Sequence, residues 1–492
     1  MLEAAKQKHK LSKKEYKKVL PFLRTRLLLI QQMLTKADFP VIILISGVDG
    51  SGKGAIINRL NKWMDPHYIQ THAFGPPSDE ERERPPHWRY WLALPPDGHM
   101  GIFAGSWYSD PLSRYMEGLM DFKQIEKALA RIHKLEEELI KDGALILKYW
   151  LHLSKTQQRQ HFKDLMKNPK TRWRVTKRDL KHLKLYDRFC AIAEHTLKAT
   201  HTTESPWLIV NGSNRYYRDL KIGNDLYHRI TSHLETRISA TAPPPPPLIK
   251  PHSARETDRL GGLDLTQSLS KKSYKTQRKH YQERLSQLAR QANKNKVSTL
   301  LVFEGWDAAG KGGAIRRITQ ALDARQYRVI PFAAPMDEEK AHHYLWRFWR
   351  HLPRAGRITI YDRSWYGRVL VERIEGLATH AEWRRAYGEI NDFEEELTDH
   401  GILVIKYWLH ISQEEQLRRF KEREKTPYKQ FKITEEDYRN REKWEEYQAA
   451  ANEMIARTHT PYAPWYLIEG NDKRFTRIKV LKIFCERLAN AL

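Results

Sequence analysis

Short apolar runs alternate along this chain with longer stretches rich in Glu, Lys and Arg. The apolar runs have the length of buried strands, and they fall at 41–45, 144–149 and 207–210, then at 300–303, 328–332, 358–361, 402–407 and 465–468. A basic helical pattern precedes the first of them in each half, at about 12–34 and 270–293. Continuously apolar strands that alternate with helices are typical of a parallel sheet covered on both faces. We therefore predict an α/β fold.

The same series occurs twice, 258 residues apart, as Lys53 is from Lys311. The matching positions include Gly47, Asp49, Gly52 and Lys53 with Gly305, Asp307, Gly310 and Lys311, and Lys148-Tyr149-Trp150-Leu151-His152 with Lys406-Tyr407-Trp408-Leu409-His410. Chance does not hold one register over roughly 200 positions, so the chain is a tandem duplication. We call the two copies the N-terminal and the C-terminal repeat.

Proline marks the junction between the two repeats. The run Pro243–Pro247 cannot pair in a sheet or lie inside a helix, and it favours an extended spacer. A proline-recognition motif is the other interpretation of this run. We expect an N-terminal domain over 1–240, a proline-rich linker over 241–258 and a C-terminal domain over 259–492, each domain a three-layer α/β structure.

A glycine-rich loop follows the first strand of each repeat and precedes a helix. It reads G-W-D-A-A-G-K-G-G at 305–313 and G-V-D-G-S-G-K-G at 47–54. Backbone N–H groups of such a loop, the helix N-terminus and the lysine all favour bound phosphate. A plain glycine turn with a solvated lysine is the alternative, but two matches in the same register favour a P-loop. The candidate phosphate-binding residues are Gly305, Gly310, Lys311, Gly312 and Gly313.

The usual hydroxyl ligand for the metal is absent from both loops. A Walker A loop normally has Ser or Thr after the lysine, whereas this chain has Gly54 and Gly312. Asp49 and Asp307, inside the loops, are the replacements we expect, because Mg²⁺ prefers carboxylate, phosphate and water oxygens.

A second carboxylate ends an apolar strand of the C-terminal repeat. Residues 358–368 read I-T-I-Y-D-R-S-W-Y-G-R, and Asp362 at the strand end should lie beside the P-loop. Arg363 and Arg368 could pair with phosphoryl oxygens, with Glu372 one turn further on. The alternative for Asp362 is a helix N-cap.

The N-terminal repeat lacks this set. Ala104, Gly105, Asp110 and Arg114 stand where the other repeat has Asp362, Arg363, Arg368 and Glu372. Phosphoryl transfer depends on positioning and on neutralising charge with metal and cations. We therefore predict that the N-terminal repeat can fold and bind phosphate but cannot catalyse.

A basic segment late in the C-terminal repeat shows the same asymmetry. Arg419 and Arg423 lie on one helix face, and Lys429 and Lys432 follow. The N-terminal repeat has His161, Leu165, Thr171 and Arg174 there. A solvated helix is the ordinary interpretation of a charge run, but the selective loss favours a lid that contacts a polyanion.

Composition limits the partners. The chain has 86 Lys and Arg against 60 Asp and Glu, a net charge of +26, which favours encounters with polyanions such as nucleic acid, anionic membranes or polyphosphate. Its two cysteines, Cys190 and Cys485, argue against a disulfide framework or a zinc site. The polar start and the short apolar runs resemble neither a signal peptide nor a membrane span, so we expect a cytoplasmic protein.

Together the motifs resemble those of the family-2 polyphosphate kinases: the P-loop at 305–313, A-A-P-M-D-E-E at 333–339 and Y-D-R-S-W-Y-G-R at 361–368. The resemblance covers both repeats and implies a thymidylate-kinase-like P-loop fold with a helical lid, using Mg²⁺ or Mn²⁺. By the same resemblance, Asp307 and Asp362 are metal ligands, and the catalytic set is completed by Lys311, Arg363, Arg368 and Glu372. The Arg419–Lys432 region matches the lid, and Pro335 and Asp337 match the segment near the nucleotide acceptor. Gly367 departs from the family motif, which commonly has Asn there.

The resemblance also implies the reaction. Family members with two fused copies transfer phosphate from polyphosphate to AMP, so polyphosphate and a nucleotide are the expected partners, without nucleic acid or membrane; a homo-oligomer stays open. Three alternatives remain. They are polyphosphate-dependent phosphorylation of nucleoside diphosphates, an ATP-dependent small-molecule kinase, and a non-catalytic protein that binds nucleic acid through its basic surface.

Overall fold

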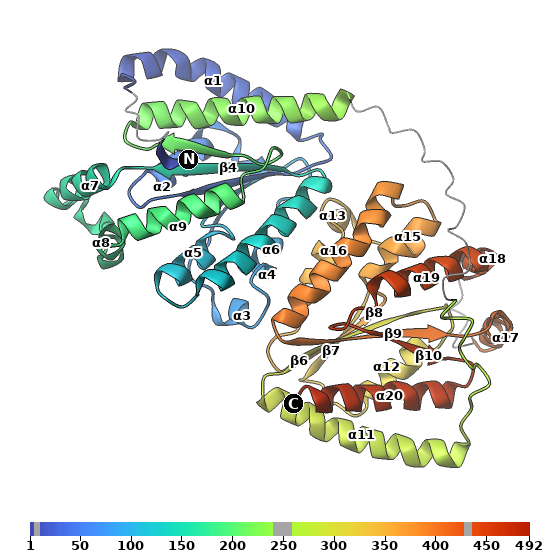
Figure 1. Ribbon diagram of the computed structural model, residues 1–492. Coiled ribbons are helices and arrows are strands. Elements are labelled where there is room, and N and C mark those ends of the chain that lie inside the picture. Colours follow the sequence, from blue (N-terminus) through green and yellow to red (C-terminus); the bar gives the residue numbers. More distant parts are fainter. Residues whose placement is uncertain (4–9, 240–257, 428–434) are drawn as a thin grey trace. The chain divides into compact units, whose positions relative to one another are not determined.

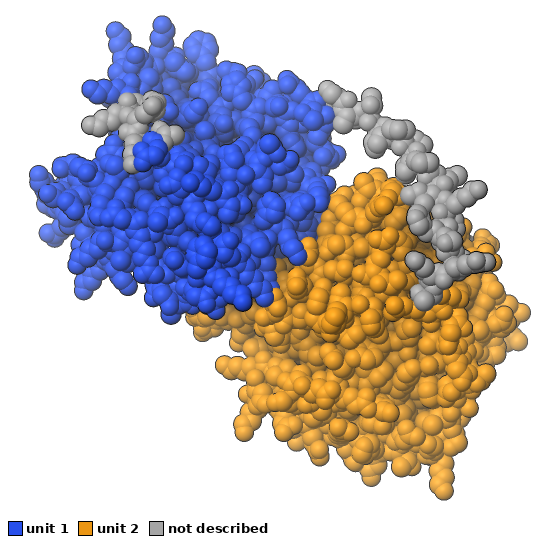
Figure 2. Space-filling model, viewed as in Figure 1, with its two compact units in different colours: residues 1–78, 89–243, 337–343 blue, residues 79–88, 244–336, 344–492 orange. Residues whose placement is uncertain are grey.

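The computed structural model describes residues 1–3, 10–239, 258–427 and 435–492. The chain groups into two compact units (Figure 2). Unit 1 consists of residues 1–78, 89–243 and 337–343, and unit 2 of residues 79–88, 244–336 and 344–492. Almost all of the expected linker, 241–257, lies outside the described residues, and the expected domain limits stay a prediction.

A five-stranded parallel sheet forms the centre of unit 1, in the order β2-β3-β1-β4-β5. Its strands are β1 Val41–Gly47, β2 Ile69–Ala73, β3 Met100–Ala104, β4 Leu145–His152 and β5 Trp207–Asn211. The central strand β1 is almost entirely buried, as a continuously apolar run between two helical layers should be.

Unit 2 is built on a sheet of the same kind, in the order β10-β9-β6-β8-β7. Its strands are β6 Ser298–Gly305, β7 Tyr327–Pro331, β8 Ile358–Asp362, β9 Ile402–His410 and β10 Trp465–Glu469. Read from β7 to β10, the order repeats that of unit 1 strand for strand. The predicted α/β class with two tandem parallel sheets is confirmed.

Helices cover both faces of each sheet (Figure 1). In the N-terminal half they are α1 Lys13–Leu34, α2 Lys53–Trp63, α3 Asp79–Arg82, α4 Trp88–Trp91, α5 Ser109–Met116, α6 Phe122–Lys141, α7 Lys155–Lys167, α8 Lys177–Lys184, α9 Tyr186–Ala199 and α10 Arg215–Ser239. In the C-terminal half they are α11 Lys271–Lys294, α12 Lys311–Thr319, α13 Asp337–Lys340, α14 Trp346–Trp349, α15 Val371–Ile374, α16 His380–Asp399, α17 Gln413–Glu424, α18 Glu435–Glu442, α19 Trp444–Thr458 and α20 Lys473–Asn490. Short 3₁₀ turns are η2 Pro66–Tyr68, η3 Arg172–Arg174 and η4 Trp365–Val369. None of the helices within the described ranges is both long and apolar enough to cross a membrane.

The long basic helices predicted before each first strand are present as α1 and α11. In unit 1, α1 lies beside α10 on one face of the sheet, and α5, α6 and α9 lie on the other. In unit 2, α11 lies beside α20 in the same way. Ser12 begins α1 with a capping box to Glu15, because its hydroxyl accepts from the Glu15 N–H while that carboxylate accepts from the Ser12 N–H.

A buried ion pair joins the sheet to the helical layer in each unit. In unit 2, Lys406 Nζ lies 2.7 Å from Glu394 Oε2, and neither side chain is accessible to solvent. The ammonium also donates to Tyr366 Oη and to the Thr458 carbonyl. Lys148 and Glu136 form the same pair in unit 1, at 2.7 Å. The Lys-Tyr-Trp-Leu-His motif is therefore a structural element of the core.

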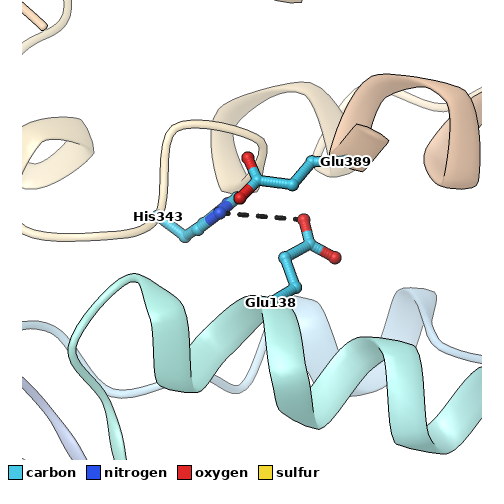
Figure 3. Close-up of side chains that lie close together, drawn as sticks. All are labelled: Glu138, His343 and Glu389. Atoms are coloured by element: carbon cyan, nitrogen blue, oxygen red, sulfur yellow. Dashed lines mark ion pairs between the residues drawn. The ribbon is translucent and has the colours of Figure 1, made fainter. Parts of the chain in front are cut away.

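An acid–histidine pair is also found in unit 1. Glu138 on α6 and His343 of the 337–343 segment lie 3.7 Å apart, Oε1 to Nε2 (Figure 3). The His343 ring also contacts Trp91, with the ring centroids 5.4 Å apart. The third side chain drawn, Glu389, belongs to unit 2.

Candidate active site

The glycine-rich loop of unit 2 joins β6 to α12, as predicted, and two of its glycines are required by geometry. Gly305 has φ +134°, and a Cβ there would lie 2.3 Å from the Leu409 carbonyl oxygen. Gly310 caps α12 with φ +110°, a left-handed conformation that glycine adopts without strain. Gly312 and Gly313 form the first turn of α12, where the backbone N–H groups at the helix start are oriented to bind an anion.

Lys311 folds back over the loop. Its Nζ donates to the Gly305 carbonyl at 2.6 Å and to the Trp306 carbonyl at 3.3 Å. Both acceptors are neutral, so an incoming phosphate would offer the ammonium a stronger, charge-assisted partner.

Asp307 is held from two sides within the same unit. Its Oδ1 accepts from Arg363 NH2 at 3.2 Å, and its Oδ2 accepts from Asn440 Nδ2 at 3.3 Å. Burial opposes ionisation of this carboxyl, but the charges of Lys311 and Arg363 and these hydrogen bonds keep its pKa below the usual value. Asp307 is therefore an ionised carboxylate, as a metal ligand must be.

Asp362 ends β8 beside the loop strand. Strand β8 pairs with β6, with Asp362 opposite Phe303, so that both strands end at the edge of the sheet that carries the P-loop. The next residue, Arg363, has φ +69°, which is strained for a residue with a side chain. Ala308 in the loop has φ +62°. The structure thus brings the predicted residues Asp307, Lys311, Asp362 and Arg363 to one edge.

Glu304, which the sequence analysis did not single out, lies at the same edge. Its side chain is buried, and its Oε1 accepts from Ser364 Oγ at 2.7 Å. Burial raises the pKa of this carboxyl to about 7; the Asp362 charge pushes it up as well, while Lys311 and Arg363 act against them. A signal was present in the sequence, because the N-terminal repeat has Ser46 at this position and so lost this acid together with the others.

Arg368 and Glu372 lie next to each other. Arg368 NH1 is 3.1 Å from Glu372 Oε2, and its guanidinium lies over the Tyr344 ring, 4.6 Å from the centroid. The predicted cation and the predicted glutamate therefore form an ion pair with each other.

Arg419 does not lie where a lid cation was expected. Its side chain is 2% exposed, and its guanidinium donates to the carbonyls of Ala308, Ala309, Gly470 and Asn471. This arginine therefore connects the P-loop to residues 470–471 and does not extend into solvent. Arg423 is half-buried on the same helix, α17, and Lys429 and Lys432 lie outside the described residues.

The acceptor segment is placed only in part. Pro335 is half-buried in unit 2, whereas Asp337 is exposed and begins α13 in the 337–343 segment of unit 1. Gly367 has Glu372 Oε1 3.7 Å from the position of a Cβ, so there is room for a small side chain.

Two indoles fill the space beside the loop. The rings of Trp306 and Trp444 are stacked, with their centroids 3.6 Å apart and their planes at an angle of 4°. Trp306 Nε1 donates to His410 Nδ1 at 3.1 Å. Burial lowers the pKa of His410 to about 4, so it is a neutral acceptor near neutral pH. The remaining cavity is about 90 Å³ and is lined by Glu304, Asp307, Lys311, Arg363 and Asn440, among others.

The chemistry of this edge is that of phosphate and metal binding. Asp307, Asp362 and Glu304 bring three carboxyl groups to this edge, and carboxylate oxygens are the hard ligands that a divalent cation prefers. Lys311 and Arg363 supply positive charge for phosphoryl oxygens. The arrangement can bring together polyanions that would otherwise repel each other.

Comparison with known proteins agrees with this geometry. A family model described as Polyphosphate kinase 2 (PPK2) matches residues 10–237 and 268–492. The Polyphosphate:AMP phosphotransferase of Pseudomonas aeruginosa is 49% identical over 484 residues, covering 98% of this chain and 97% of that protein. The protein of the same name from Pseudomonas syringae pv. tomato is 44% identical over 497 residues, covering 100% of this chain and 99% of its own length. A crystal structure from Pseudomonas aeruginosa PA01, assigned to polyphosphate kinase 2, superposes with a TM-score of 0.88 at 46% identity, covering 100% of this chain and 99% of that one.

Proposed function

Because the chain belongs to the polyphosphate kinase 2 family, we propose that it transfers the terminal phosphate of inorganic polyphosphate to AMP and so forms ADP. Relatives named for this reaction match over nearly their whole length, which supports the choice of AMP. The main structural support is that Asp307, Lys311, Arg363 and the end of β8 lie together at one edge of the sheet.

We assign the roles from this geometry. Asp307 and Asp362, with Glu304 nearby, would hold Mg²⁺ or Mn²⁺, which when bound neutralises phosphate charge. Lys311 would leave the Gly305 carbonyl for a phosphoryl oxygen, and Arg363 would bind another. Arg368 and Glu372 would position η4 and α15 through their ion pair.

The transfer needs little further chemistry. A phosphate oxygen of AMP attacks the terminal phosphorus of the polyphosphate chain; one P–O bond forms, and the P–O bond to the rest of the chain breaks. The shortened polyphosphate leaves with the electron pair. The attacking oxygen is already ionised near neutral pH, so no strong general base is required, and positioning and charge neutralisation do the work.

The donor and the acceptor can be tested in one assay series. With Mg²⁺ and polyphosphate, we expect ADP from AMP at a rate at least tenfold above that with ATP as donor, measured by separation of the nucleotides. Phosphorylation of AMP from ATP alone would refute polyphosphate as the donor. Faster turnover of ADP or GDP than of AMP would refute AMP as the acceptor.

Asp362→Asn tests the metal assignment. The change keeps the shape of the side chain but removes the charge, so kcat should fall about 100-fold or more, as for loss of a major electrostatic contribution. Asp323→Asn is a matched control, since Asp323 is exposed in unit 2 and pairs with Arg325. Full activity of Asp362→Asn under limiting Mg²⁺ would contradict the assignment.

A further inference from the structure

The P-loop of unit 1 borders a cavity of about 420 Å³, much larger than the 90 Å³ beside the loop of unit 2. Pockets for small molecules occupy about 300–1,000 Å³. The repeat that lacks the catalytic carboxylate therefore contains the larger space, and its size suits a small molecule.

Two amino-acid differences between the repeats explain the larger cavity of unit 1. Val48 stands where unit 2 has Trp306, and Tyr186 stands where it has Trp444, so the stacked indoles have no counterpart. Tyr186 is held by its hydroxyl, which donates to the Leu153 carbonyl at 2.7 Å. Without the stacked pair, the space beside the N-terminal loop is not filled by the protein's own side chains.

Aromatic and apolar side chains form one wall of the cavity. Trp150 and Phe189 lie nearly parallel, with ring centroids 6.0 Å apart and planes at 23°. The rest of this wall consists of Leu112, Met116, Leu185 and the rings of Tyr108 and Tyr186. Two lining residues carry a buried polar atom without a hydrogen-bond partner among the described residues, namely Trp150 Nε1 and Gln158 Oε1.

The phosphate loop also lines the cavity, through Gly47, Val48, Asp49 and Lys53. Lys53 Nζ lies on the Gly47 carbonyl at 2.7 Å, as Lys311 lies on Gly305, and Gly52 caps α2 with φ +98°. Asp49 Oδ2 is paired with His182 Nδ1 at 2.7 Å. Burial opposes ionisation of Asp49, but His182 and Lys53 lower its pKa to about 2.

Cations of α8 line the rim of the cavity. They are Lys177, Arg178 and Lys181, and Arg178 NH2 also donates to Ser113 Oγ of α5 at 3.3 Å. At the first two positions the C-terminal repeat has Glu435 and Glu436. The N-terminal repeat is thus more basic at these two positions than the C-terminal repeat, although it lacks counterparts of Asp362 and Arg363.

We propose that this cavity is a non-catalytic binding site for a nucleoside phosphate such as ADP or ATP. The phosphates would occupy the loop at 47–53 beneath the α8 cations, and the base would lie against the wall of Trp150 and Phe189. A polyphosphate chain would bind to the loop and to the α8 cations but would leave the aromatic side chains uncovered. A nucleotide base would bury apolar area of its own and of these side chains. With Ala104 in place of the strand-end carboxylate, the site binds its ligand without transferring phosphate.

The test uses the full-length protein and photolabelling with 8-azido-ADP, followed by peptide mapping. Peptides that cover 108–117 or 177–189 should be labelled, and unlabelled ADP should compete. Label in C-terminal peptides reports separately on the site of unit 2, so failure of either proposal is visible by itself. Absence of label from both N-terminal regions at saturating 8-azido-ADP would overturn the proposal.

Two variants change the cavity in opposite ways. Lys53→Ala removes a phosphate partner, and Val48→Trp places an indole in the space; each should lower the N-terminal label at least tenfold. Lys62→Ala, an exposed lysine on the same helix as Lys53, should leave it unchanged. Label that persists in both variants, or that polyphosphate displaces while ADP does not, would refute a nucleotide site. Retained C-terminal label in each variant shows that unit 2 is folded, and an unchanged far-UV circular dichroism spectrum and thermal unfolding midpoint are the control for the fold of unit 1.

Discussion

At the scale of single residues, Glu304 is subject to opposite demands from folding and from catalysis. Its pKa of about 7 in the folded protein exceeds the ordinary value of 4.5, so folding favours the protonated form. Stability from this group is complete below pH 4.5, decreases as the pH rises toward 7, and stays low above that. The ionised form, which a metal site at this edge would use, is therefore the form that destabilises the fold.

We expect Glu304→Gln to stabilise the metal-free protein and to impair turnover. Gln can still accept from Ser364 but carries no charge, so the unfolding midpoint should rise by about 3 °C or more at pH 8 and much less at pH 5. Activity should fall at both pH values. Thermal unfolding at the two pH values and the AMP assay measure these effects, and a variant that is active and no more stable at pH 8 would contradict both parts.

The residues at the loop edge show how far sequence reasoning reaches. Asp307, Lys311 and Arg363 were predicted from motif spacing, and the structure places them together. Asn440 was missed because it approaches Asp307 from a helix 133 residues away, which no local pattern reports. Arg419 was predicted as a lid cation because helical spacing defines a face, but spacing does not say whether that face turns toward solvent or toward the P-loop.

At the scale of elements, the buried pair Lys406–Glu394 holds β9 against α16. Lys406→Met should destabilise the protein by about 3–5 kcal/mol, because Glu394 would remain buried without its countercharge. Urea unfolding measures this loss, and adding Glu394→Leu should recover a large part of it. Lys479→Met is the control, since its pair with Glu469 is more exposed and should contribute less than about 1 kcal/mol. Equal effects of the two lysine changes would show that burial of the first pair has no energetic consequence.

Eight of the ten strands in the described residues fall on predicted apolar runs, and α1 and α11 were predicted from helical spacing, but β2 and β3 of unit 1 were missed. The prediction placed only Lys406 and Tyr407 of the Lys-Tyr-Trp-Leu-His motif on a strand, whereas β9 continues to His410. A lysine in that strand gives no sign that its partner lies on a helix. The short helices α14 and α15 were not predicted, since four residues are too few to show a period.

At the scale of the whole molecule, the duplication predicted two similar sheets, and their strand orders agree. The grouping of residues 79–88 with unit 2 and of residues 337–343 with unit 1 was not predictable in this way. Hydrophobic periodicity reports the type of an element and the face it buries, but not the unit to which a short segment belongs.

Restoring one carboxylate should not make the N-terminal repeat catalytic. In a full-length chain weakened by Asp362→Asn, adding Ala104→Asp should leave AMP phosphorylation at the residual rate of the Asp362→Asn chain, because Gly105 and Asp110 still replace two arginines. The AMP assay on both chains measures this, and unit 2 with its native Asp362 serves as the positive control. A rate from the double variant above that of the Asp362→Asn chain would refute the inactivity of this repeat.

The left-handed backbone at Ala308 and Arg363 makes loss of these two residues from a repeat energetically easier than their return. The N-terminal repeat has Gly50 and Gly105 at these positions, with φ +76° and +78°, where glycine is at ease and a side chain costs about 1–2 kcal/mol. Exchanging a strained residue for glycine relaxes the fold at once, whereas the reverse exchange brings strain immediately and turnover only after the other groups have returned. Loss of these two residues from one repeat of a duplicated kinase therefore increases the stability of the fold, whereas their return decreases it.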